Sequence, residues 1–268
     1  MKTGNVLITG GTSGLGFELA KLFCKESYDV WVTGRSLKTG LPEGMKMHFL
    51  RTDFSDLRQT ARIIQQVTAG GIKFDIIVNN AGVLGPAEFC LTGDGFEYTF
   101  QINFLSHLLI NNIIFSALDP CDHIKLAIVT SPVYRLVQPG FRIPSKENYE
   151  SYSVYALSKH YLLLSGDYLK KRHNSKDISL IKFNPGVFRS GIYRTKKKWF
   201  HLLYKTAAPF MTSPSTPARK LFQLIGSDSV SDRIIYRRPD SAGEISPQLT
   251  CEAEDFLFSC QQAVEVMG

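Results

Sequence analysis

The feature that most limits the possible folds is a glycine-rich turn between an apolar segment and an amphipathic one. Residues 5–9 suit a buried strand, and residues 17–23 carry apolar side chains at helical spacing. Between them the glycines follow a G-x-x-x-G-x-G pattern. Backbone N–H groups at the start of such a helix, together with the helix dipole, form a site for a pyrophosphate. We therefore expect a dinucleotide to bind here, through Gly10, Thr12, Ser13, Gly14, Leu15 and Gly16.

Strand and helix patterns alternate along the rest of the chain. Strands are predicted at residues 30–33, 48–52, 74–78, 124–129, 178–183 and 233–237. Helices are predicted at about residues 55–68, 103–115, 155–172, 217–226 and 250–266. This alternation predicts an α/β fold with one doubly wound parallel sheet of about seven strands and helices on both faces. We expect residues 1–268 to form a single domain, because no repeat or linker interrupts them.

Residues after the second, third and fourth predicted strands bear on how the dinucleotide is bound. Arg35 and Ser36 follow the second predicted strand, where folds that prefer NAD place an acidic residue for the ribose 2′-hydroxyl. A guanidinium matches a 2′-phosphate, so Arg35 favours NADP(H), although a surface arginine that leaves NAD unassisted is the alternative. Asp53, with Phe54 beside it, could accept a hydrogen bond from adenine, or could equally be a turn residue or helix cap. Asn80, Ala81 and Gly82 follow a buried strand at the same edge of the sheet.

A tyrosine and a lysine one helical turn apart supply candidate proton chemistry. Tyr155 and Lys159 lie on the same face of a helix. An ammonium group near a phenol stabilises the phenolate and lowers the pKa of the tyrosine. Such a pair can take a proton from an alcohol or give one to a ketone. The alternative is a solvated pair on an amphipathic helix, so the interpretation depends on the other sites.

Further polar residues lie at the expected carboxyl edge of the sheet. Ser131 ends the fifth strand pattern, and Pro185 and Gly186 close the sixth. Asn103 lies among apolar neighbours, where a lone Asn is normally a locally satisfied buried group. Residues 132–152 read as a long loop, which is usually functional when it has no secondary structure of its own.

Composition excludes several classes of protein. The net charge of +7 is spread along the chain, apart from one cluster at residues 194–198, and no nucleic-acid-binding motif accompanies it. Five scattered cysteines show neither metal spacing nor a disulfide framework. We expect no metal, no nucleic-acid partner, no signal peptide and a cytoplasmic location.

Taken together, these motifs resemble the short-chain dehydrogenase/reductase family. The residues that carry the resemblance are the turn at residues 9–16, residues 79–82, Ser131, Tyr155 with Lys159, and Pro185 with Gly186. Within the family, residues 92–97, the Asn103 segment and the long spacing from Ser131 to Tyr155 resemble the branch of retinol dehydrogenases and WW-domain oxidoreductases.

The resemblance implies a Rossmann-type fold and a role for each matching residue. Tyr155 would be the general acid/base, and Lys159 would lower its pKa and hold the nicotinamide ribose. Ser131 would hydrogen-bond the substrate oxygen, and Asn103 would seat a water for proton relay. Asn80 would line the adenosine side. Val187 and Ser190 would grip the carboxamide, beside Pro185 and Gly186. Subunit contact through the helices of Asn103 and Tyr155 would give a homodimer or homotetramer.

The sequence thus predicts an NADP(H)-dependent oxidoreductase that interconverts a hydrophobic alcohol and its ketone or aldehyde. Aromatic residues within 187–212 suggest an apolar cover over the substrate, with contact to an anionic membrane as the second interpretation of that segment. The alternative from another class is a nucleotide-binding regulatory or scaffold protein that kept the fold and lost the chemistry.

Overall fold

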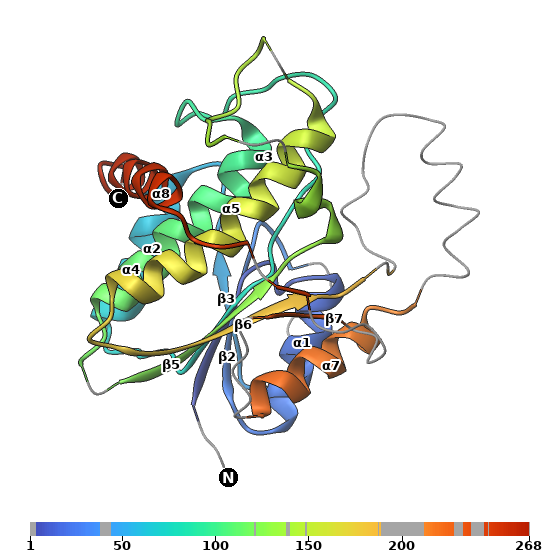
Figure 1. Ribbon diagram of the computed structural model, residues 1–268. Coiled ribbons are helices and arrows are strands. Elements are labelled where there is room, and N and C mark those ends of the chain that lie inside the picture. Colours follow the sequence, from blue (N-terminus) through green and yellow to red (C-terminus); the bar gives the residue numbers. More distant parts are fainter. Residues whose placement is uncertain are drawn as a thin grey trace.

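The computed structural model shows an α/β protein built on one central sheet (Figure 1). It describes residues 4–37, 44–120, 122–137, 140–147, 149–186, 188, 212–227, 233–236, 244–245 and 247–267. The predicted covering segment at residues 187–212 therefore lies outside the described residues, apart from Phe188 and Thr212. The single-domain organisation stays a prediction.

The sheet has the strand order β3-β2-β1-β4-β5-β6-β7-β8. Its parallel body consists of β1 (Asn5–Ile8), β2 (Asp29–Gly34), β3 (Met47–Arg51), β4 (Ile76–Asn79), β5 (His123–Val129) and β6 (Asp177–Asn184). β7 (Arg233–Tyr236) adds a further parallel strand, and the short β8 (Glu244–Ile245), which the sequence pattern did not predict, pairs with it antiparallel. The predicted doubly wound parallel sheet is confirmed. Its strand order reverses between β1 and β4, and ligands bind at the carboxyl ends of strands beside such a reversal.

Helices cover both faces of the sheet (Figure 1). α1 (Gly14–Lys25) and α7 (Ser215–Gly226) pack on one face. α2 (Leu57–Ala69), α4 (Ser106–Ser116) and α5 (Ser151–Arg172) pack on the other. The strands supply both cores by alternation, since Val6 and Ile8 join the α1 side and Leu7 joins the α2 side. α8 (Cys251–Glu265), the predicted terminal helix, packs outside α4 and α5.

Helix boundaries differ from the predicted ones where polar side chains cap the ends. α2 begins at Leu57 because the carboxylate of Asp56 accepts a hydrogen bond from Gln59 N at 2.8 Å. α5 begins at Ser151, earlier than Tyr155, because Glu150 accepts bonds from the backbone of Tyr152 and Ser153. The predicted loop at residues 132–152 contains a short 3₁₀ helix, η2 (Pro132–Leu136).

The predicted helix around Asn103 is not uniform. It consists of α3 (Tyr98–Phe100), one π-helical turn η1 (Gln101–Leu105) and then α4. Single π turns inside α-helices are uncommon and often occur at functional sites.

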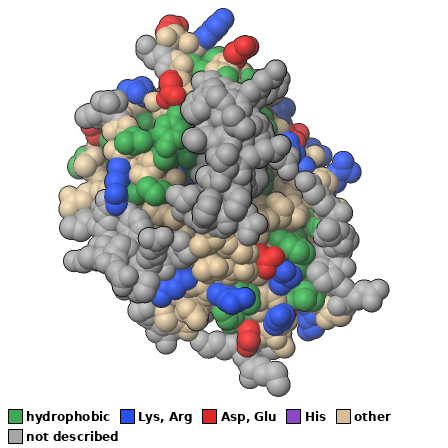
Figure 2. Space-filling model, turned by 90° about the vertical axis from the view of Figure 1, so that its right-hand side faces the viewer, with side chains coloured by type: hydrophobic (Ala, Val, Ile, Leu, Met, Phe, Trp, Pro, Cys, Tyr) green, Lys and Arg blue, Asp and Glu red, His purple; other side chains and the backbone are tan. Residues whose placement is uncertain are grey.

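Charge and hydropathy of the described residues add two observations. On the face shown in Figure 2, Lys and Arg side chains are distributed singly or in small groups, with acidic side chains among them. Within the described ranges, no helix is both long and apolar enough to cross a membrane.

Candidate active site

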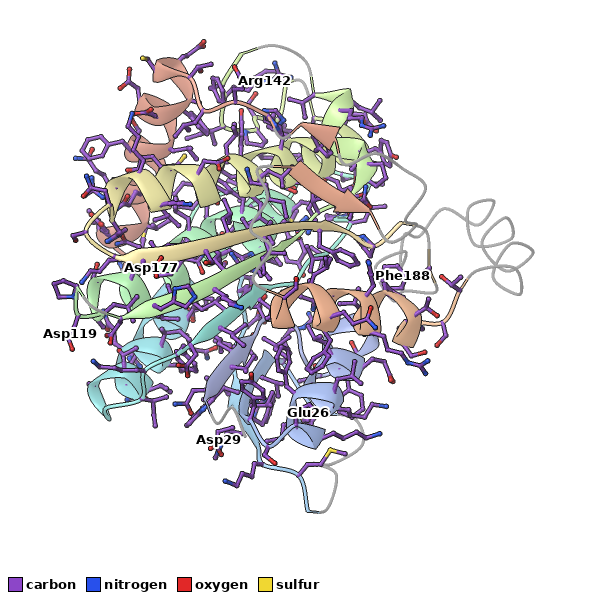
Figure 3. The ribbon with its side chains drawn as sticks, turned by 60° about the horizontal axis from the view of Figure 1, so that its bottom comes forward. Glu26, Asp29, Asp119, Arg142, Asp177 and Phe188 are labelled. Carbon is purple, nitrogen blue, oxygen red and sulfur yellow. The ribbon has the colours of Figure 1, made fainter. Side chains whose placement is uncertain are left out.

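A cleft of about 750 Å³ lies at the carboxyl edge of the sheet. Most of the predicted site residues line it: Gly10, Thr12, Ser13, Gly14, Leu15, Arg35, Asp53, Phe54, Asn80, Ala81, Gly82, Ser131, Tyr155, Lys159, Pro185 and Gly186. Phe188 also lines it, and Figure 3 shows this residue at the opposite end of the sheet from Asp119 and Asp177. Gly16, Ser36 and Asn103 do not line the cleft, and Val187 and Ser190 lie outside the described residues.

Gly16, the last glycine of the turn, is packed too tightly to be replaced by a residue that has a side chain. A Cβ on Gly16 would lie 2.5 Å from Asn80 Nδ2 and 2.7 Å from Gly10 O. Gly16 therefore lets α1 approach the turn and the strand beside it, although it does not face the cleft. Ser13, the N-cap residue of α1, makes no side-chain capping bond, and it lines the cleft together with Gly14 and Leu15. Uncapped N–H groups at a helix start suit an anion, so these residues fit a dinucleotide pyrophosphate.

The hydroxyl of Thr9 joins the glycine turn to the segment after β4. Thr9 Oγ1 accepts hydrogen bonds from the backbone N–H of Asn80 at 2.8 Å and of Ala81 at 3.0 Å. Asn80 Nδ2 returns a bond to Thr9 O at 2.8 Å. These bonds fix the orientation of two residues that line the cleft.

His107, to which the sequence pattern assigns no role, completes this network. Its Nδ1 lies 3.1 Å from Asn103 O and its Nε2 lies 2.9 Å from Thr9 Oγ1. A carbonyl only accepts, so we assign the proton to Nδ1, and Nε2 then accepts from the Thr9 hydroxyl. Burial, helped by the charge of Lys159, lowers the pKa of His107 to about 3, so the ring is neutral. The sequence feature that could have indicated this role is the spacing of four residues, about one helical turn, between Asn103 and His107.

The residues expected to contact the adenosine half of a dinucleotide follow β2 and β3. Arg35 and Ser36 are exposed just after β2, and among the described residues Arg35 forms no ion pair. Asp53 Oδ1 accepts bonds from Ser55 N at 3.0 Å and Ser55 Oγ at 2.8 Å. Asp53 is thus a turn residue, as one alternative expected, and its second oxygen makes no bond to the described residues.

Residues 92–97, which carry part of the family resemblance, help to hold the cleft wall at Phe54 in place. Asp94 Oδ2 accepts from Leu57 N and from Gln101 Nε2, both at 2.8 Å. Gln101 Nε2 also lies 3.0 Å from Phe54 O. The motif therefore fixes the backbone of Phe54, which lines the cleft.

Tyr155 and Lys159 occupy the inner wall of the cleft. Tyr155 is 8% exposed and Lys159 is 3% exposed, so the pair is not a solvated one. Lys159 Nζ donates to Val129 O at 3.2 Å, and a Cβ on Gly82 would lie 3.2 Å from the same nitrogen. Burial lowers the pKa of Lys159 to about 8. The ammonium group is therefore held at the carboxyl end of β5, two residues before Ser131.

Asn103 lies behind this wall rather than on it. Its Oδ1 accepts from Val83 N at 2.7 Å, and its Nδ2 donates to Val83 O at 2.9 Å and to Ser158 Oγ at 3.0 Å. The side chain thus ties the segment after Gly82 to the helix of Tyr155. Water relay by Asn103 stays a prediction.

Comparison with known proteins identifies the family. The model of the short chain dehydrogenase family matches residues 4–200. The chain therefore belongs to this family, whose fold binds NAD or NADP.

Four curated relatives illustrate the similarity. Polyprenol dehydrogenase of Danio rerio is 27% identical over 75% of this chain and 69% of its own length. WW domain-containing oxidoreductase of Gallus gallus is 28% identical over 78% of this chain and 54% of its own length. Retinol dehydrogenases 12 and 14 of Mus musculus are each 26% identical, so the predicted branch is confirmed. The chain matches about half to two thirds of these relatives' lengths.

Solved structures agree on the fold. A short chain dehydrogenase from Burkholderia cenocepacia in complex with NADP aligns with a TM-score of 0.63, at 16% identity over 88% of both chains. One from Leptospira borgpetersenii with bound NAD+ has a TM-score of 0.64, at 20% identity over 84% of this chain and 86% of its own.

We expect Gly16→Ala to weaken dinucleotide binding, because the new Cβ would push α1 away from Asn80 and the Gly10 carbonyl. The dissociation constant for NADPH, measured by fluorescence titration, should rise about tenfold or more, equal to ~1.4 kcal/mol. Gly226→Ala should bind like the wild type, because beyond its chain neighbours and the backbone of its own helix no atom lies within 4 Å of the new Cβ. Equal affinities for the two variants would contradict the packing role.

We expect His107 to make the fold sensitive to acid. Its folded pKa of about 3 lies below the unfolded value of about 6.5, so only the unfolded chain takes up the proton in between. Its contribution is therefore fully present above pH 6.5 and is lost as pH falls toward 3, by up to ~1.4 kcal/mol per pH unit.

Urea unfolding at pH 7 and pH 4.5 measures this effect. His107→Gln should lose less stability between the two pH values than the wild type. The same pH dependence in His107→Gln and the wild type would show that His107 is not the group responsible.

Proposed function

We propose that the protein is an NADP(H)-dependent oxidoreductase that interconverts a hydrophobic alcohol and its ketone or aldehyde. The observation that carries the proposal is that Ser131, Tyr155 and Lys159 line one cleft together with the glycine turn. A binding module would need the turn alone, whereas this wall adds groups suited to moving a proton.

Tyr155 acts as the general acid in reduction and the general base in oxidation. A nicotinamide cofactor bound in the cleft would supply or accept the hydride. The Ser131 hydroxyl donates to the substrate oxygen and holds it in the cleft. Tyr155 gives its phenolic proton to that oxygen, or takes it back in the reverse direction. The ammonium group of Lys159, with a pKa of about 8, is largely charged at pH 7 and stabilises the phenolate.

Preference for NADPH over NADH rests on Arg35. Its guanidinium is exposed at the mouth of the cleft and unpaired among the described residues, so it is free to bind a 2′-phosphate. The cleft contains no carboxylate at the position directly after β2, where an acidic residue would hold a 2′-hydroxyl.

A hydrophobic substrate is supported by the wall of the cleft and by the relatives. Val83, Leu84, Pro86, Ala87 and Phe188 contribute apolar surface. Two of the relatives are named for alcohols, polyprenol and retinol. The apolar chains of such alcohols suit a wall of this composition.

A homodimer or homotetramer stays a prediction. All apolar residues of α4 and α5 are buried within one chain, except Ile113 and Tyr152. Subunit contact through these two helices would therefore use mainly their polar residues.

Tyr155→Phe should lose turnover and keep cofactor binding, because the ring remains while the proton donor is removed. The expected loss of kcat is ~10²–10⁴-fold, measured with aryl and alkyl ketones, at an unchanged dissociation constant for NADPH. Tyr152→Phe, on the same helix but 46% exposed, is the matched control and should retain wild-type turnover. Retention of more than about a tenth of wild-type kcat in Tyr155→Phe would refute the assignment.

Arg35→Ala should reduce kcat/KM for NADPH about tenfold or more and leave that for NADH nearly unchanged, because only NADPH carries the 2′-phosphate. Arg62→Ala removes an exposed arginine of α2 that does not line the cleft, and should change neither value. If the wild type used both cofactors equally well, the NADPH preference would be wrong.

A further inference from the structure

The connection between Ser131 and Tyr155 builds part of the cleft wall. Tyr149 OH donates to Pro86 O at 2.8 Å, and Ser151 Oγ donates to Gly85 O at 3.2 Å. The ring of Tyr149 packs edge-on against Phe89, with centroids 5.5 Å apart. Gly85 and Pro86 both line the cleft, so the position of this wall depends on the connection.

The middle of the connection is held by an aromatic cluster. Phe141 lies 5.7 Å from Tyr161, nearly parallel to it, and 5.7 Å from Phe256, as centroid distances. Tyr161 and Phe256 lie 4.7 Å apart, so the three rings contact one another pairwise. Tyr161 OH accepts from Arg142 N at 2.9 Å, which adds a polar contact to the same stretch. Arg142 lies in the loops beyond the helices in Figure 3.

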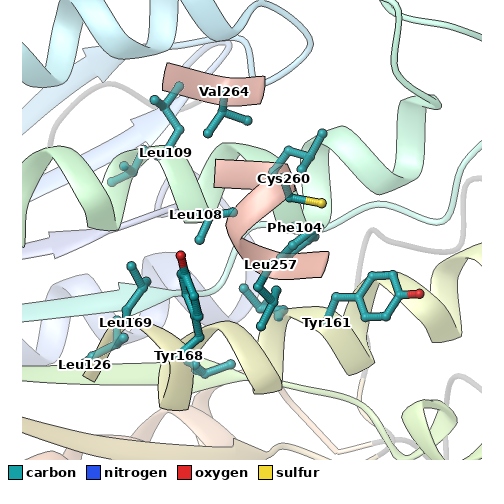
Figure 4. Close-up of a cluster of buried hydrophobic side chains, with 14 of the residues drawn as sticks. Phe104, Leu108, Leu109, Leu126, Tyr161, Tyr168, Leu169, Leu257, Cys260 and Val264 are labelled. Atoms are coloured by element: carbon teal, nitrogen blue, oxygen red, sulfur yellow. The ribbon is translucent and has the colours of Figure 1, made fainter. Parts of the chain in front are cut away.

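Phe256 lies on α8, which is far from Phe141 in the sequence and is anchored against α4 and α5. Leu257, Cys260 and Val264 are buried among side chains of α4 and α5 (Figure 4). Buried polar groups add specificity, since Tyr168 OH donates to Gln261 Oε1 at 2.8 Å and Gln261 Nε2 donates to Asn112 Oδ1 at 2.9 Å.

We propose that α8 is a positioning element for the substrate side of the cleft, and that Phe256 is its positioning residue. Phe256 holds Phe141 against Tyr161, and this contact fixes the position of the connection. The bond from Tyr149 in turn fixes the cleft wall at Gly85 and Pro86. Tyr161 lies on the helix of Tyr155 and Lys159, so the cluster joins the wall to the helix that performs the chemistry. The effect on catalysis rests on the proposed function, whereas the fixing of the connection does not.

The test replaces Phe256 by Ala in the full chain, with Phe258→Ala as the matched control. Phe258 is on the same helix, but its ring is 41% exposed and lies against Arg172 instead of Phe141. Trypsin cleavage after Arg142 should be about tenfold faster in Phe256→Ala, because local opening of the connection costs less. The KM for the ketone should rise severalfold at nearly unchanged kcat and NADPH affinity, and Phe258→Ala should match the wild type.

Tyr161→Phe provides a second variant that creates no cavity. It keeps the ring contacts and removes only the hydroxyl, which accepts from Arg142 N and donates to Arg142 O, so cleavage after Arg142 should accelerate less than in Phe256→Ala but measurably. Wild-type cleavage rates and KM in Phe256→Ala, or equal changes in Phe258→Ala, would overturn the proposal. If no ketone is turned over, the cleavage rates still decide the role of α8, and only the proposed function fails.

Discussion

The hydroxyl of Thr9 is the contact on which the arrangement of the cleft depends. It accepts the backbone N–H groups of Asn80 and Ala81 and lies within hydrogen-bonding distance of His107. One side chain thereby joins the glycine turn, the end of β4 and the start of α4. The contact with His107 is buried and the bonds to Asn80 and Ala81 are partly buried. A buried polar group without its partner costs ~1–3 kcal/mol, so these bonds hold the three elements together. Lys159 and Tyr155 are then placed against a rigid wall.

Much of the cleft follows from local sequence patterns. An apolar strand, a glycine turn and an amphipathic helix define one end, and parallel winding brings Ser131, Tyr155, Asn80 and Pro185 to the same edge. These predictions succeeded because each depends on neighbours in the chain and on one general rule of topology. The predicted starts of α2 and α5 were less accurate. Capping bonds accepted by Asp56 and Glu150 set these starts, and from the sequence alone either residue could equally have belonged to a turn.

Contacts between distant segments could not be predicted. His107 reads as one polar residue in an apolar helix, and only the fold brings it to Thr9, 98 positions away. The π turn at Asn103 cannot be recognised from the spacing of apolar residues. The Asn103 side chain within this turn nevertheless bonds to both Val83 and Ser158. Likewise, α8 was predicted as a helix, but nothing in its sequence shows that Phe256 meets Phe141. Packing partners of this kind depend on tertiary structure rather than on local propensity.

The central claim is that this cleft transfers hydride between NADPH and a carbonyl carbon. The most direct measurement uses NADPH deuterated at C4 of the nicotinamide, with a panel of aryl and alkyl ketones, and detects product by mass spectrometry. The account predicts alcohol that carries one deuterium on its carbinol carbon, from one of the two C4 faces only. Tight NADPH binding without any deuterated alcohol from either C4-labelled form would contradict it and would indicate a nucleotide-binding protein without this chemistry.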